Sequence, residues 1–136
     1  MELVAKDDVL GGLKKFKRLA KQDLLASTLT SDPEFWRAMA EARRRKYAEL
    51  MDLIERNGVE WTRDQSLQDY ARLPLLEPDD HSHPDIRGEE QALEMFFSLL
   101  GTDRKTLREL RSQRPPSAAS TPDFSPGQEM PAQASS

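Results

Sequence analysis

The stretch from residue 33 to residue 57 constrains the fold most, because it is a long helical pattern with a marked beginning and end. Ser31-Asp32 supplies a side-chain acceptor ahead of Pro33, which suits the first helical position, and Asn57-Gly58 marks the end. Large or apolar side chains recur along it at alternating steps of four and three, at Trp36, Ala40, Arg43, Tyr47, Leu50 and Ile54. This spacing predicts one long central helix, about 33–57, that presents a single seam to other helices.

Four shorter helices are predicted around the central one. The first, from about residue 9 to 25, is amphipathic, and its basic side carries Lys14, Lys17, Arg18 and Lys21. A capping-box spacing at 62–65 begins a second helix, which Pro74 ends, and residues 75–88 are expected to form a surface loop. Helices at 89–100 and 103–111 follow, the former capped by Gly101 and the latter by Thr102. The chain is therefore expected to be an all-α bundle of about five helices.

The composition changes near the carboxyl end of the chain. Hydrophobic residues make up 37% of the sequence and charged residues 32%, which favours a soluble domain with a small core. Residues 115–136 contain five prolines, five serines and only two charged residues. Such a segment buries too little apolar area to offset its backbone entropy. We therefore expect a helical domain over 1–111 and a disordered, Pro/Ser-rich tail over 112–136.

The residue inventory predicts neither an enzyme nor a bound cofactor. There is no cysteine, which excludes disulfides, thiolate metal sites and cysteine nucleophiles and fits a cytoplasmic location. No glycine-rich phosphate loop or nucleophile-elbow motif is present, and no apolar run is long enough for a transmembrane helix. Pairs of acidic residues lie in charge-rich surroundings, where nothing indicates a catalytic acid or base.

The one candidate metal site is the loop that contains His81, His83 and Asp85. Residues two apart in an extended segment point to the same side, so the two imidazoles and a nearby carboxylate could share a metal ion. A solvated polar loop is the competing interpretation. We expect no metal there, because zinc sites usually combine well-separated ligands that other residues support.

Contact with another protein, or with a second copy of the chain, is the function that this pattern favours. A long amphipathic helix, a modest core and a peptide-like tail are typical of an adaptor, scaffold or assembly protein. The expected contact residues are Trp36, Tyr47, Met51 and Ile54 on the central helix, with Phe124 in the tail as a short peptide anchor.

A DNA-binding regulator is the alternative. Residues 99–110 resemble the helix-turn-helix of many bacterial regulators, with a glycine at the turn, a polar cap and a basic second helix. The resemblance implies that residues of about 89–111 form the motif and that DNA is contacted by Arg104, Lys105, Arg108 and Arg111. Phe97 stands where the family usually has a small residue. A third possibility is peripheral contact of the basic side of helix 9–25 with an anionic membrane or an acidic partner.

Overall fold

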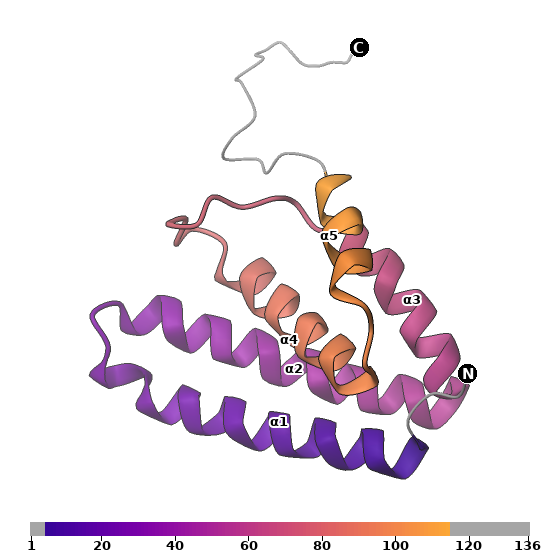
Figure 1. Ribbon diagram of the computed structural model, residues 1–136. Helices are drawn as coiled ribbons and strands as arrows, with labels where there is room; N and C mark the ends of the chain where they lie inside the picture. Colours follow the sequence, from indigo (N-terminus) through magenta and orange to yellow (C-terminus); the bar gives the residue numbers. More distant parts are fainter. Residues whose placement is uncertain (1–4, 115–136) are drawn as a thin grey trace, which may run out of the picture.

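The computed structural model describes residues 5–114, and this part of the chain is all-α, as predicted. Its elements are α1 (Lys6–Ala26), the short 3₁₀ helix η1 (Ser27–Leu29), α2 (Pro33–Asn57), α3 (Val59–Arg72), α4 (Pro84–Leu100) and α5 (Arg104–Ser112). The helices α1 and α2 form an antiparallel hairpin, α4 packs on α2, and α3 and α5 lie side by side at one end (Figure 1). None of the helices within 5–114 has the length and apolar character needed to cross a bilayer.

The central helix has the bounds that its sequence pattern predicts. Asp32 is its N-cap, and the Oδ1 atom of Asp32 accepts a hydrogen bond from the backbone N–H of Phe35 at 3.4 Å. Gly58 ends the helix with φ of 90°, a conformation that L side chains rarely adopt, and α3 begins at the next residue. α2 packs against α1 on one side and against α4 on another, so it is the centre of the bundle.

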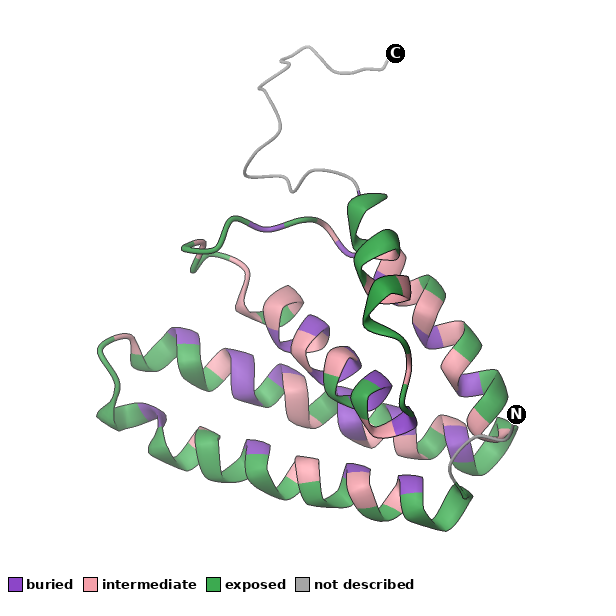
Figure 2. Ribbon diagram, in the orientation of Figure 1, coloured by how far each residue is buried: buried purple, intermediate pink, exposed green. Residues whose placement is uncertain are grey.

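The core is concentrated where α4 meets α2 and α3. Ala92, Leu93, Phe96 and Phe97 of α4 are completely buried. The ring of Phe97 meets Tyr70 of α3 edge to face, with centroids 5.4 Å apart. Figure 2 shows that the buried positions of α1, α2 and α4 lie mainly on the sides that face one another, whereas α5 has no buried residue. α5 is therefore the most weakly anchored helix of the described chain.

Several predicted boundaries are wrong. α4 begins at Pro84, which suits the first helical position, rather than at residue 89. Gly88 lies inside the helix, where α4 crosses α2 closely. α3 begins at Val59, so Thr62 is inside it and donates its hydroxyl hydrogen to the carbonyl oxygen of Gly58 at 2.8 Å. Asp103, not Thr102, is the N-cap of α5, since its carboxylate accepts a hydrogen bond from the N–H of Lys105 at 3.1 Å.

The carboxyl end of α4 follows the prediction. Gly101 adopts the left-handed conformation with φ of 74°. Its N–H donates to the carbonyl of Ser98 at 3.1 Å, and the N–H of Thr102 donates to the carbonyl of Phe97 at 2.9 Å. These two bonds form a Schellman cap.

The folded part of the chain extends beyond the predicted limit at residue 111. Ser112 is the last residue of α5, and Arg114 is buried. The rest of the predicted tail, residues 115–136 with Phe124, lies outside the described residues. The described residues up to Arg114 therefore take part in the packing of the bundle.

Candidate binding groove

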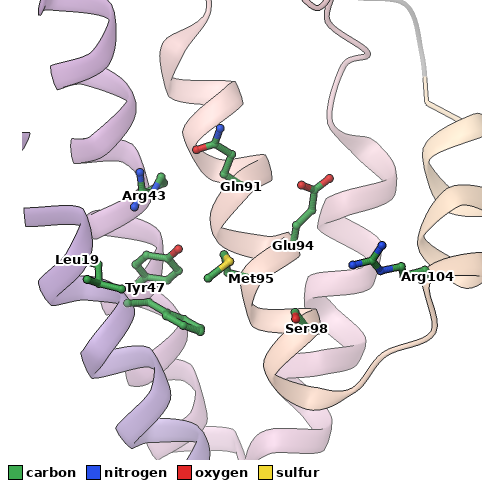
Figure 3. Close-up of a pocket in the computed structure, with 9 residues that line it drawn as sticks. Leu19, Arg43, Tyr47, Gln91, Glu94, Met95, Ser98 and Arg104 are labelled. Atoms are coloured by element: carbon green, nitrogen blue, oxygen red, sulfur yellow. The ribbon is translucent and has the colours of Figure 1, made fainter. Parts of the chain in front are cut away.

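Two adjoining cavities of about 390 and 470 Å³ follow the outer face of α4. They share Glu94, Ser98 and Arg104 in their walls, so we treat them as one feature, the α4 groove. The first cavity is lined by Phe16, Leu19, Arg43, Tyr47, Gln91, Glu94, Met95, Ser98 and Arg104. The second is lined by Tyr70, Glu94, Ser98, Gly101, Thr102, Arg104, Leu107, Arg108 and Arg111. Figure 3 shows the first cavity, with Leu19 and Tyr47 on one side of α4 and Arg104 on the other.

The floor of the first cavity is apolar. Phe16 of α1 and Tyr47 of α2 pack with their ring centroids 5.7 Å apart. Two large apolar side chains remain open to solvent beside them, Leu19 with 42% of its surface exposed and Met95 with 40%. Leu19 and Met95 come from different helices and line the same cavity, so they form a small exposed apolar patch inside a concave surface.

The rim of the groove is cationic. Four arginines line the two cavities, against the single carboxylate of Glu94. Arg43 is bonded to Asp23 of α1, with 2.9 Å between Nη1 and Oδ2. Arg43 is part of the predicted seam, and the acid that pairs with it comes from the neighbouring helix α1. Arg104 and Arg108 are exposed, and their side chains make no hydrogen bond or ion pair with other residues of the range 5–114.

The carboxylate of Glu94 is held at the middle of the groove by a neighbour on either side. The hydroxyl of Tyr70 donates a hydrogen bond to Glu94 Oε2 at 2.8 Å, and Arg111 Nη1 lies 3.9 Å from the same oxygen. Burial of the ring, reinforced by this hydrogen bond, raises the pKa of Tyr70 to about 12. Because Glu94 already has these partners, its charge is partly neutralised and the groove presents a net positive potential.

A buried ion pair lies next to Tyr70, one of the residues that line the second cavity. The guanidinium of Arg114 pairs with Glu90 of α4, stacks on the ring of Tyr70 at 4.3 Å from its centroid, and donates through Nε to the Tyr70 carbonyl at 3.0 Å. Arg111 lies 3.8 Å from the same Glu90 carboxylate. These contacts connect α3, α4 and the segment after α5, so they fix the position of Arg114, the last described residue, beside Tyr70.

The predicted contact residues of α2 differ in how far the fold buries them. Tyr47 and Ile54 are buried in the core, so a partner cannot reach them in this fold, although Tyr47 forms part of the groove floor. Met51 is half-buried. Trp36 is exposed near the turn between α1 and α2, where it lines a separate, smaller cavity. The predicted anchor Phe124 lies outside the described residues.

Three of the four residues expected to contact DNA, Arg104, Arg108 and Arg111, line the second cavity of the groove, whereas Lys105 does not. α5 packs mainly against α3, not against α4. The helix pair that defines a helix-turn-helix is therefore arranged differently here. Phe97, which stands where the family usually has a small residue, is completely buried and packs against Tyr70 of α3.

The residues of the candidate metal site have separate partners. His81 Nδ1 lies 2.9 Å from Asp32 Oδ2, and its ring stacks on Phe35 with centroids 3.9 Å apart. His83 Nδ1 lies 3.1 Å from Asp80 Oδ2. Asp85 lines a different small cavity on the side of α2. Within residues 5–114 no group of three or more histidine and carboxylate side chains is placed to hold a metal ion.

The loop before α4 is a polar turn, not a catalytic arrangement. Ser82 donates from its hydroxyl and its backbone N–H to Asp80, which lowers the pKa of that carboxyl to about 2. Ser82 Oγ and Asp80 both contact the same Nδ1 atom of His83, whereas a nucleophile and its orienting acid need opposite ring nitrogens. Arg87 also ties the turn to α4 by donating to the carbonyls of Glu77 and Asp80.

The basic side of α1 is open, as its periodicity predicts. Lys14, Arg18 and Lys21 are exposed, and Lys17 is half-buried beside Arg44 of α2. Membrane or acidic-partner contact through these residues stays a prediction. Comparison of the chain with protein-family models, with curated proteins and with solved structures finds no match.

Proposed function

We propose that this protein is a non-enzymatic interaction protein, of the adaptor, scaffold or assembly type, and that its α4 groove binds an acidic segment of another protein. The observation that carries the proposal is the pairing of exposed apolar side chains with arginines that lack partners within residues 5–114. Leu19 and Met95 form the apolar part, and Arg104 and Arg108 supply the free charge. The proposal keeps the interaction function expected from the sequence but moves the contact surface from the α2 seam to the α4 groove.

The groove has the size and chemistry for a few side chains of a peptide. Cavities of about 390 and 470 Å³ fall in the range that holds a small ligand or several side chains. An aliphatic or aromatic anchor would cover Leu19 and Met95. Carboxylates of the same segment would receive bidentate hydrogen bonds from Arg104 and Arg108. Burial of the anchor would supply most of the affinity, and the arginines would supply specificity and a fast association rate.

The alternative, a DNA-binding regulator that uses Arg104, Lys105, Arg108 and Arg111, has less support. The arginines open into a concave groove that also holds apolar side chains and a carboxylate, and Arg111 already contacts Glu90 and Glu94. A duplex requires a protruding cationic surface that reaches phosphates on both sides of a groove. We also propose a cytoplasmic location, which the absence of cysteine supports.

A phage-displayed library of random 12-residue peptides, selected against the full chain, tests the proposal. The expected result is enrichment of acidic peptides that contain at least one large apolar residue. A synthetic copy of the best peptide should then lose about tenfold or more of its affinity for the double variant R104E/R108E in fluorescence anisotropy.

Arg45 of α2 provides the matched control, because it is an exposed arginine outside the groove. R45E should change the peptide affinity by less than about twofold. Failure to enrich any peptide, enrichment of basic peptides, or equal loss with R45E overturns the proposal. Binding of a labelled DNA duplex that R104E/R108E abolishes and that falls steeply with salt would favour the regulator instead.

A further inference from the structure

We propose that residues 121–126 of this same chain, Thr-Pro-Asp-Phe-Ser-Pro, occupy the α4 groove in the absence of a partner, with Phe124 as the apolar anchor and Asp123 as the charged contact. The inference rests on the proposed function, because it concerns regulation of the same groove. A partner segment must then displace the protein's own segment before it can bind.

The chemistry of residues 115–136 matches the groove. This part of the chain has two acidic side chains, Asp123 and Glu129, and no lysine or arginine, so it is complementary in charge to a rim with four arginines and one carboxylate. Phe124 is the only aromatic residue after Phe97. An aromatic side chain beside a carboxylate fits a groove whose first cavity is lined by Leu19, Met95 and Arg104 and whose adjoining cavity adds Arg108.

The last described residue, Arg114, also lies close to the groove. Arg114, with a side chain only 1% exposed, is held against Tyr70, and Tyr70 lines the second cavity of the groove. Phe124 follows ten residues later, and ten residues of extended chain span at most about 33–36 Å. The two cavities follow α4 and its C-terminal cap from Gln91 to Gly101, and ten residues of helix cover only about 15 Å. The segment can therefore reach either cavity.

Attachment to the same chain makes a weak contact sufficient. A short flexible linker gives its ligand an effective concentration on the order of 1 mM. A segment whose intrinsic Kd is about 0.1 mM would then occupy the groove about nine-tenths of the time. A competing partner would bind about tenfold more weakly to the intact chain than to one whose own anchor is removed.

The absence of cysteine makes a direct test possible in the full chain. Ser125→Cys introduces a single thiol beside Phe124, and a nitroxide attached to it broadens the NMR signals of nearby amides. The expected result is strong broadening at Gln91, Met95, Ser98 and Arg104, with little at Trp61 of α3, which lies outside the groove. Adding Phe124→Ala to the labelled chain should remove the effect, while a nitroxide at Ser136→Cys should give weaker broadening of the same amides.

Three results would overturn the inference. The first is broadening that is absent or does not favour the groove, and the second is broadening that persists in Phe124→Ala. The third is equal broadening when an unlabelled ¹⁵N chain is mixed with a nitroxide-bearing chain, which would show that the segment binds a second copy. Since these measurements need no partner peptide, the inference can fail while the phage selection succeeds, and the reverse. When both hold, Phe124→Ala should raise the affinity for the selected peptide about tenfold.

Discussion

Gly88 of α4 lies so close to Ala42 of α2 that a Cβ atom added at Gly88 would stand 2.7 Å from the Cβ of Ala42. The same atom would lie 2.5 Å from the backbone carbonyl oxygen of Met39. A contact this short against backbone cannot be relieved by rotation of a side chain. The distance between α2 and α4, and with it the position of the groove face of α4, depends on the missing side chain at residue 88.

Gly88→Ala is expected to destabilise the fold by about 1–3 kcal/mol, because overpacking of the α2–α4 contact outweighs the gain in helix propensity. Gly11→Ala is the matched control, since a Cβ at Gly11 of α1 would meet nothing within 4 Å. That variant should be more stable than the parent chain by up to about 1 kcal/mol. Urea denaturation followed by circular dichroism measures both, and shifts of the same sign would contradict the described packing.

Arg114→Met is expected to cost about 2–4 kcal/mol, because it leaves the carboxylate of Glu90 largely buried without its closest partner. The ion pair of Arg56 with Asp52 is a control, since Arg56 is exposed on the surface of α2. Arg56→Met should cost less than about 0.5 kcal/mol. Equal effects of the two variants on the free energy of unfolding would show that Arg114 is not buried in solution.

Both tyrosines should ionise late in the folded protein. Burial raises the pKa of Tyr47, and burial together with the hydrogen bond to Glu94 raises the pKa of Tyr70 to about 12. A folded pKa above the unfolded value of 10 means that the neutral phenol stabilises the fold fully below pH 10 and that this stabilisation is lost as the pH rises toward 12. Absorbance at the tyrosinate band should rise in 6 M guanidinium at lower pH than in buffer. Coincident titration curves would contradict this.

The turn before α4 should make the fold sensitive to acid. Hydrogen bonds from Ser82 lower the pKa of Asp80 to about 2, and the hydrogen bond with His81 lowers the pKa of Asp32. A folded pKa below the unfolded value means that stability is present above pH 3.8 and is lost as the pH falls toward 2. Thermal melts between pH 4 and pH 2 should therefore decline more steeply for the parent chain than for Asp80→Asn. If the melting temperature falls equally steeply with pH in the parent chain and in Asp80→Asn, the hydrogen bonds to Asp80 do not stabilise the fold.

The sequence predicts the helices whose signals are local. Asp32, Pro33 and Gly58 act on their own neighbours, so the ends of α2 follow from residue chemistry alone. The residues next to Gly88 in the sequence do not show why a glycine is needed there. Gly88 resembles a helix breaker in the sequence, and only the contact with Met39 and Ala42 shows why glycine is needed inside α4. The tertiary contact accounts for the glycine at residue 88, whereas the earlier start of α4 has a local signal in Pro84, which the pattern assigned to the loop.

The groove could be predicted only in part. Leu19 and Met95 belong to the apolar faces of their helices in the sequence pattern, yet 42% and 40% of their surfaces stay exposed in the first cavity. The periodicity that marks a helix face for burial does not distinguish a core from an interface. For that reason Ile54 was expected at a contact surface and is found in the core.

The burial of Arg114 determines how a mechanical load would enter the molecule. The guanidinium of Arg114 is bonded to Tyr70 of α3 and to Glu90 of α4. Tension applied to the chain beyond residue 114 is therefore transmitted through this side chain to α3 and α4. α5, the helix with no buried side chain, therefore carries less of this load for as long as the contacts of Arg114 hold. A partner that pulls on the carboxyl end would accordingly strain the packing around Tyr70 in the core before it unwinds α5.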